Sequence, residues 1–152
     1  RDSRVRPNQI LALSLSNPVL EGKKAARVLE KVWRELYTAY GLRSLSPRCR
    51  EYRGGYSGNQ RERDAAYHQG TVWAWLLGHF ITACRRVHGD TKESRDMARR
   101  LIEPVKDHLR DAGIGSISEI FDGAEPLRPR GCVAQAWSVG EILRAYVEDV
   151  LN

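Results

Sequence analysis

The stretch of residues 68–87 is apolar on nearly every side, and it constrains the fold more than any other feature of the sequence. Its apolar positions are 72, 73, 75, 76, 77, 80, 81, 84 and 87. A helix with a single apolar stripe lies on a surface, whereas a helix that is apolar nearly all round is buried. We therefore expect a helix over residues 68–87 inside a larger body.

Three further segments carry apolar residues at the 3–4 spacing that predicts helices. They are residues 22–37, 91–113 and 131–151. Gly41 is a candidate stop for the first, and Pro104 is expected to break or kink the second. Residues 9–15 alternate enough to pass for a strand, but the sequence offers no second strand to pair with them. Helix is therefore preferred there, and the predicted class is all-α.

Residues 42–63 lose the helical periodicity and accumulate glycine, serine and proline. A loop of more than about 12–15 residues inside a domain is usually functional or mobile. Helices joined alternately by short turns and by long loops predict helical hairpins whose loops gather at one end.

Composition limits the classes of protein to which the chain can belong. Its 152 residues fit one domain with a real core, and 41% hydrophobic content is ordinary for a globular protein. The sequence contains no run of about 18 apolar residues, the length that a membrane-spanning helix needs. The net charge of +6 comes from basic residues interleaved with acidic ones, unlike the one-signed patch of a nucleic-acid-binding surface. The chain begins with Arg1, so we expect a processed start or a piece of something longer.

The cysteines and histidines give little support to a metal site or to disulfides. Cys49, Cys84 and Cys132 are far apart, odd in number and without CxxC spacing, and no HExxH pair occurs. We expect a reducing, cytoplasmic location, with no metal and no cofactor.

Glu119 is the carboxylate that most deserves a chemical interpretation. It lies in the segment SEIFDG, residues 118–123, between two helix entrances that are both polar and aromatic. A lone glutamate is usually exposed, but Ile120 and Phe121 would lower the local dielectric if the loop packs inward. Asp122 is more simply a turn former. Asp64, the other carboxylate near a helix entrance, is more simply an ion-pair partner of a neighbouring arginine.

Amide, imidazole and indole groups at the helix entrances are candidates for contacts with a hydroxyl-rich ligand. His68 and Gln69 either bond the backbone of the helix start or donate to ligand hydroxyls. Trp73 and Trp75 point to different helix faces, so Trp73 is expected to face a pocket and Trp75 the core.

Gln135 and Trp137 follow the same logic at the start of the last helix. A glutamine among apolar neighbours is costly unless its amide is paired. Trp137 either offers its ring to a ligand or belongs to the core.

Five segments together resemble the C-terminal part of glycogen debranching enzymes. They are RPNQ at residues 6–9, YGLRSLSP at 40–47, YHQGTVW at 67–73, SEIFDG at 118–123 and QAWS at 135–138. They look most like the amylo-α-1,6-glucosidase domain of bacterial and archaeal members. The resemblance follows the family's order over nearly the whole chain, and the combination is specific although each segment alone is weak.

The resemblance implies a fold and an activity. The fold would be a glucoamylase-like (α/α)6 toroid, of which residues 1–152 supply a single partial domain of about five to six helices with long loops at one end. The activity would be inverting hydrolysis of α-1,6 branch points in glycogen or limit dextrin, with a branched α-glucan as partner and without metal or cofactor. Glu119 matches the general base. The substrate-binding residues would be His68, Gln69, Trp73, Gln135, Trp137 and Arg43.

One departure from the family pattern concerns the general acid. The family uses an aspartate in an upstream segment that has no match here, so we expect the chain alone to be inactive and to need upstream helices of its own domain. An uncovered apolar face would favour a homo-oligomer. Three other interpretations stay open: another glucoamylase- or trehalase-like α-glucosidase, a non-catalytic carbohydrate-binding helical module and, third, a basic nucleic-acid-binding protein.

Overall fold

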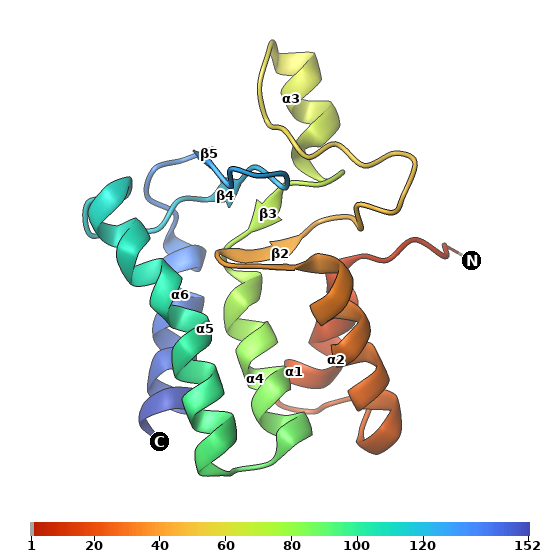
Figure 1. Ribbon diagram of the computed structural model, residues 1–152, viewed down its shortest axis with the longest axis vertical. Coiled ribbons are helices and arrows are strands. Elements are labelled where there is room, and N and C mark those ends of the chain that lie inside the picture. Colours follow the sequence, from red (N-terminus) through yellow and green to blue (C-terminus); the bar gives the residue numbers. More distant parts are fainter. Residues whose placement is uncertain (1) are drawn as a thin grey trace.

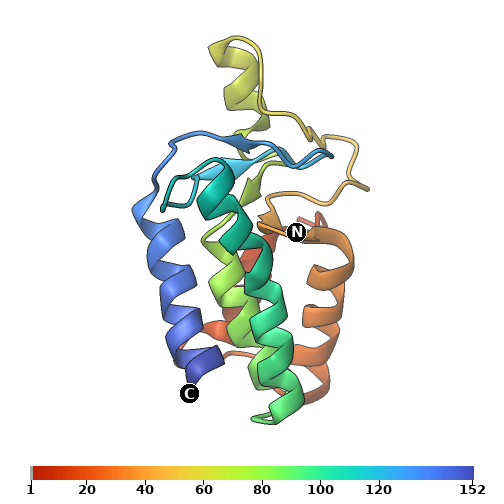
Figure 2. The ribbon, with the colours of Figure 1, turned by 60° about the vertical axis from the view of Figure 1, so that its left-hand side comes forward.

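The computed structural model describes residues 2–152, and helix α4 (Leu76–His88) lies in the middle of its helical body (Figure 1; Figure 2). Helices α1, α2, α5 and α6 all pack against it. Leu77, Phe80, Ile81 and Cys84 have no exposed surface. The predicted buried helix is therefore confirmed, but it starts at Leu76 rather than at residue 68.

The helices around α4 follow the predicted amphipathic segments closely. Their bounds are η1 (Pro7–Ile10), α1 (Leu11–Ser14), α2 (Gly22–Leu36), α5 (Lys92–Asp111), α6 (Ala136–Ala145) and the π-helical η2 (Tyr146–Leu151). Thr91 caps α5 by accepting from the backbone N–H of Ser94, which fixes where that helix begins. Of the break or kink expected at Pro104, the break does not occur, because α5 continues through it to Asp111; the kink stays a prediction.

A five-stranded antiparallel sheet corrects the prediction of an all-α fold. Its strands, in spatial order, are β1 (Tyr37–Thr38), β2 (Gly41–Arg43), β3 (Val72–Trp73), β4 (Ile120–Phe121) and β5 (Pro129–Arg130). Strands of two or three residues are too short to display the alternation by which a strand is predicted. The chain is therefore mostly helical, with a small sheet joining segments far apart in the sequence.

Gly41 lies in the sheet and does not terminate a helix. Helix α2 ends at Leu36, and Gly41 pairs with Thr38 across the β1–β2 hairpin. A Cβ atom at Gly41 would collide with the carbonyl oxygen of Trp73 on β3. Glycine is required here because two strand backbones approach closely.

Helix α3 (Gln60–Tyr67) was missed because part of it falls within the predicted loop of residues 42–63. Its signal is the capping box, in which Asn59 and Glu62 each bond the other's backbone N–H. The helix stands beyond the sheet, away from the helical body (Figure 1). The sheet, α3 and the long loops thus share one end of the molecule, as the sequence predicted for the loops. Within residues 2–152, none of the helices has the length and apolar character needed to cross a membrane.

Candidate active site

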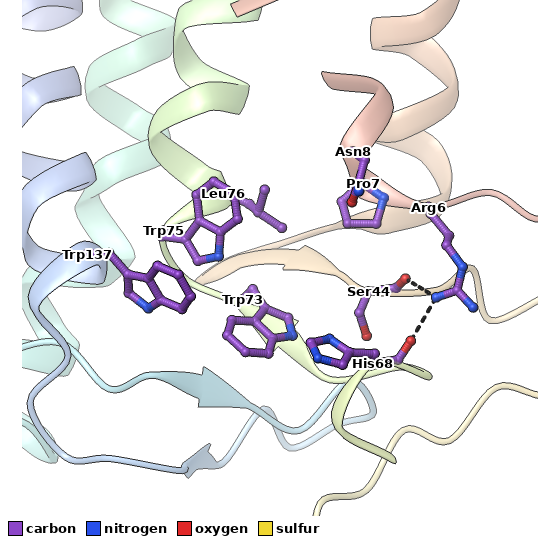
Figure 3. Close-up of a pocket in the computed structure, with 9 residues that line it drawn as sticks. All are labelled: Arg6, Pro7, Asn8, Ser44, His68, Trp73, Trp75, Leu76 and Trp137. Atoms are coloured by element: carbon purple, nitrogen blue, oxygen red, sulfur yellow. Dashed lines mark hydrogen bonds between the residues drawn. The ribbon is translucent and has the colours of Figure 1, made fainter. Parts of the chain in front are cut away.

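A cavity of about 340 Å³ lies at the sheet end of the helical body (Figure 3). The N-terminal segment before η1, strand β3 and the starts of α4 and α6 meet around it. The cavity is lined by Arg6, Pro7, Asn8, Ser44, His68, Trp73, Trp75, Leu76 and Trp137. Three of the predicted contact residues, His68, Trp73 and Trp137, are therefore brought together.

Aromatic rings form much of the cavity wall (Figure 3). The His68 and Trp73 rings stack with centroids 5.3 Å apart, and Trp75 stacks on Trp137 at 5.6 Å. The expectation that Trp75 belongs to the core is wrong, since both indoles line the cavity; strand β3, instead of a helix, carries Trp73. Flat apolar ring faces with polar edges suit a sugar ring, which has apolar C–H faces and hydroxyl edges.

Arg6 fixes the polar side of the cavity. Its guanidinium donates to the carbonyl oxygens of His68 at 2.8 Å and Ser44 at 3.1 Å, and to Gln69 Oε1 at 2.9 Å. The side chain of Gln69 is thereby turned toward Arg6, and Gln69 lines a neighbouring cleft. Our residue-by-residue interpretation missed this role of Arg6, although the RPNQ segment contains it.

Glu119 is held by hydrogen bonds to both of its carboxylate oxygens. It directly precedes β4, and its backbone N–H donates to Cys132 O at 2.9 Å. The Cys132 backbone N–H returns a bond to Glu119 Oε2 at 2.9 Å, and the Tyr67 hydroxyl donates to Oε1. The residue is 9% exposed, so it is buried.

The electrostatics of Glu119 favour the ionised carboxylate. Burial raises the pKa of Glu119, but the hydrogen bonds from Tyr67 and Cys132 together lower that pKa by more, and it lies below the ordinary value. For Tyr67, burial and then the bond to Glu119 raise the pKa, which keeps the phenol protonated as a donor. A carboxylate that stays charged at neutral pH can accept a proton, as a general base must.

Gly131 provides the space that Glu119 occupies. Its φ of +68° lies in the left-handed region, and a Cβ atom there would lie 2.5 Å from Glu119 Oε2. Glycine satisfies both requirements, since it has no Cβ and adopts positive φ at no steric cost. The position of the carboxylate thus depends on this glycine.

Tyr67 links Glu119 to the cavity. In the part of the chain that the structure describes, Glu119 is not among the residues lining the cavity. The Tyr67 ring, however, packs edge-on against both His68 and Trp73, with centroids 4.8 Å away in each case. Sequence reasoning missed Tyr67, although it immediately precedes His68 in the quoted YHQGTVW segment.

His108, on α5, supports the segment that contains Glu119. Its Nε2 accepts a hydrogen bond from the Ser118 backbone N–H at 3.2 Å, and its ring packs edge-on against Phe121 at 4.9 Å. Burial lowers the pKa of His108, partly opposed by the charge of Asp111. Accepting through Nε2 requires that this nitrogen carry no proton.

This arrangement predicts a pH-dependent stability. Since the pKa of His108 is lowered in the folded chain, the unfolded chain binds more protons below about 6.5, the ordinary histidine value. The contribution of His108 to the free energy of unfolding is therefore present above pH 6.5 and falls as the pH drops below it. His108→Gln offers an oxygen to the same N–H without titrating. We expect the melting temperature of the original protein, relative to this variant, to fall between pH 7 and pH 5; a constant difference would contradict the assignment.

Two predicted contact residues, Arg43 and Gln135, and two carboxylates, Asp122 and Asp64, are not among the described residues that line the cavity. Arg43 donates to the carbonyl oxygens of Gly123 at 2.8 Å and Tyr37 at 3.2 Å, so it holds the loop after β4. Gln135 is the N-cap residue of α6, and its backbone N–H donates to Ile117 O. Among residues 2–152, the cavity lining includes neither. Asp122 forms an ion pair with Arg130 at 3.0 Å, which is more than a turn role, and Asp64 is exposed on α3.

A family model described as amylo-alpha-1,6-glucosidase matches residues 1–144. The chain belongs to this family. The chain is also similar to the glycogen debranching enzyme of Saccharomyces cerevisiae, with 29% identity over 166 aligned positions. The alignment covers 97% of this chain and 11% of the yeast protein, so the chain spans about a tenth of that relative's length.

Proposed function

We propose that the chain is part of a glycoside hydrolase that releases glucose from α-1,6 branch points of glycogen or limit dextrin, with Glu119 as general base. The observation that carries the proposal is a buried carboxylate that is hydrogen-bonded by Tyr67, whose ring packs against Trp73 in the wall of an aromatic cavity of about 340 Å³. Membership of the amylo-alpha-1,6-glucosidase family and the similarity to a glycogen debranching enzyme support the substrate class.

In the proposed inverting mechanism, Glu119 takes a proton from a water molecule as the water oxygen attacks C1 of the terminal glucose. The bond between C1 and the branch oxygen breaks, and a general acid protonates that oxygen. Two such carboxyl groups lie about 6.5–9.5 Å apart, which leaves room for the water. The lowered pKa of Glu119 suits the base, because the acid and the base need different environments.

The general acid is proposed to come from another part of the domain. Asp122 is buried nearby, but it accepts from the Tyr56 backbone N–H at 2.8 Å and from two nitrogens of Arg130. These donors engage both carboxylate oxygens of Asp122, which therefore has a structural partner and is not proposed as the acid. We therefore expect residues 1–152 alone to release no glucose.

We propose that residues 1–152 form part of an (α/α)6 toroid and that helices from elsewhere in the polypeptide cover its open side. Support comes from large apolar side chains that are about half-exposed or more on α6, on η2 and in the loop that follows α5. These are Ile114, Leu143, Val147 and Leu151.

Removing the Tyr67 hydroxyl should raise the pKa of Glu119, because a hydrogen bond to the charged form is lost. Glu119 must be ionised to act, so the acid limb of the kcat/KM profile of Tyr67→Phe should move to higher pH. The diagnostic effect is the position of this limb and not the rate at neutral pH, because a hydrogen bond to the ionised base stabilises the ground state more than the transition state. Tyr146→Phe, on η2 and partly buried, is the control. An unchanged acid limb in Tyr67→Phe would show that Tyr67 does not tune the base.

Product analysis tests the proposed function. The full-length protein that contains this chain would be assayed for glucose release from an α-1,6-branched limit dextrin, from linear maltooligosaccharides and from trehalose. Release mainly from the limit dextrin is expected. Release mainly from linear chains or trehalose would favour a different α-glucosidase, and dextrin binding without turnover would favour a non-catalytic carbohydrate-binding module.

A further inference from the structure

A second, larger cleft lies beside the cavity on the far side of Gln69. Its volume is about 680 Å³, and it separates helix α3 from the loop that follows β2. The cleft is lined by Arg50, Glu51, Tyr52, Arg53, Ala65 and Gln69. The proposed reaction makes no use of it.

The groups that line this cleft are suited to hydroxyls. Arg50 and Arg53 present guanidinium donors and Glu51 an acceptor, all on exposed residues. Gln69 accepts from Arg6 through Oε1, which leaves its amide N–H groups for a ligand. Tyr52 adds a half-buried ring. Mixed donors and acceptors around one aromatic ring fit a polyhydroxyl ligand, whose hydroxyls can donate to Glu51 and accept from the guanidinium groups.

Three consecutive residues connect this cleft with the other parts of the site. Tyr67 bonds Glu119, His68 lines the cavity and Gln69 lines the cleft. Because adjacent Cα atoms are only 3.8 Å apart, the cavity and the cleft lie at neighbouring residues of one short segment.

The backbone fixes the outer wall of the cleft to this segment. The Arg53 N–H donates to Gln69 O at 2.6 Å, and the Gly123 N–H donates to Gly54 O at 2.7 Å. The loop therefore bonds both the residues that follow Tyr67 and those that follow Glu119. A ligand held in the cleft is thereby held at a set position relative to the base, which is how binding away from the reacting bond aids a reaction.

We propose that this cleft is an outer subsite that binds further glucose units of the branched α-glucan whose terminal unit occupies the cavity. The proposal rests on the proposed function. It predicts that substrates with long glucan chains gain affinity from the cleft, whereas the shortest α-1,6-linked substrate does not reach it.

The test compares chain lengths in the full-length protein. The double variant Arg50→Ala and Arg53→Ala keeps the backbone bonds of the loop, and Arg99→Ala with Arg110→Ala on the exposed side of α5 is the control with the same charge change. Both would be assayed for glucose release from limit dextrin and from isomaltose. For limit dextrin, KM should rise about tenfold or more in the first variant, in line with lost bonds to charged groups. Its kcat and its isomaltose kinetics should stay within about twofold of the original protein, as for surface changes away from the chemistry.

Two results would overturn the subsite, and they are distinguishable from failure of the proposed function. Equal losses on both substrates, or an unchanged KM for limit dextrin, would mean that the cleft does not bind the glucan chain, while the unaltered protein still releases glucose. If the unaltered protein releases glucose from neither substrate, the proposed function itself fails, and the subsite with it.

Discussion

Replacing Glu119 by glutamine is expected to lower kcat for glucose release about 10²- to 10⁴-fold, the range attributed to one general base. The amide has nearly the same shape, and its oxygen can still accept from the Tyr67 hydroxyl or the Cys132 N–H, which bond the carboxylate in the structure. It cannot take a proton from water. Dextrin binding should therefore persist while turnover is lost, as measured by steady-state glucose release and by calorimetric binding.

Glu103→Gln is the matched control for this substitution. Glu103 is exposed on α5 and pairs with Lys106 at 2.7 Å, a surface ion pair worth about 0–1 kcal/mol. The control should keep full activity. If Glu119→Gln is as fast as the control, Glu119 has a structural role only; if it also loses dextrin binding, the defect lies in folding or in substrate recognition.

Substituting alanine for Gly131 is expected to have the next largest effect. The substitution forces an L-residue into the left-handed region, at about 1–2 kcal/mol, and sets a Cβ 2.5 Å from Glu119 Oε2. The carboxylate must move by the order of an ångström, a displacement that can cost about 10²-fold in rate. The loss should appear in kcat, measured on limit dextrin, with a modest drop in melting temperature.

Gly115→Ala separates backbone strain from displacement of the base. Gly115 also has a positive φ, +85°, but an added Cβ there meets no atom within 4 Å. It should lose a similar amount of stability while keeping its activity. Equal loss of activity in the two variants would mean that strain alone explains the result and that Gly131 does not position Glu119.

The helices were predictable from the sequence because burial imposes a regular spacing over many residues. The buried α4 and the amphipathic α2 and α5 follow directly from that spacing. Helix starts were less predictable: the apolar positions begin at Val72, but Val72 and Trp73 belong to a strand that pairs with β2 and β4. Pairing partners that lie about 30 and 50 residues away along the chain give no local signal.

The site was predictable only in part, for a similar reason. Glu119, His68, Trp73 and Trp137 stood out through residue type and through resemblance to a family. The residues that hold these side chains in place did not stand out, because each of them forms its hydrogen bonds across a long sequence separation. Arg6 bonds residues 44, 68 and 69, and Tyr67 bonds residue 119.

Arg43 and Gln135 show the opposite limitation. Both lie in segments that carry the resemblance, and both were predicted to contact substrate. Arg43 instead bonds backbone carbonyl oxygens, and Gln135 precedes the first turn of α6. A matching segment identifies a neighbourhood, whereas only the fold determines which of its side chains face a cavity. The contacts of these two residues with substrate stay a prediction.

The most direct test of the central claim is the anomeric form of the glucose first released from limit dextrin by the full-length protein, followed by proton NMR. If Glu119 activates water opposite the departing oxygen, β-glucose forms first and mutarotates later, and Glu119→Gln yields almost none. If α-glucose forms first, or if the variant produces β-glucose at the original rate, Glu119 is not the base of an inverting α-1,6-glucosidase.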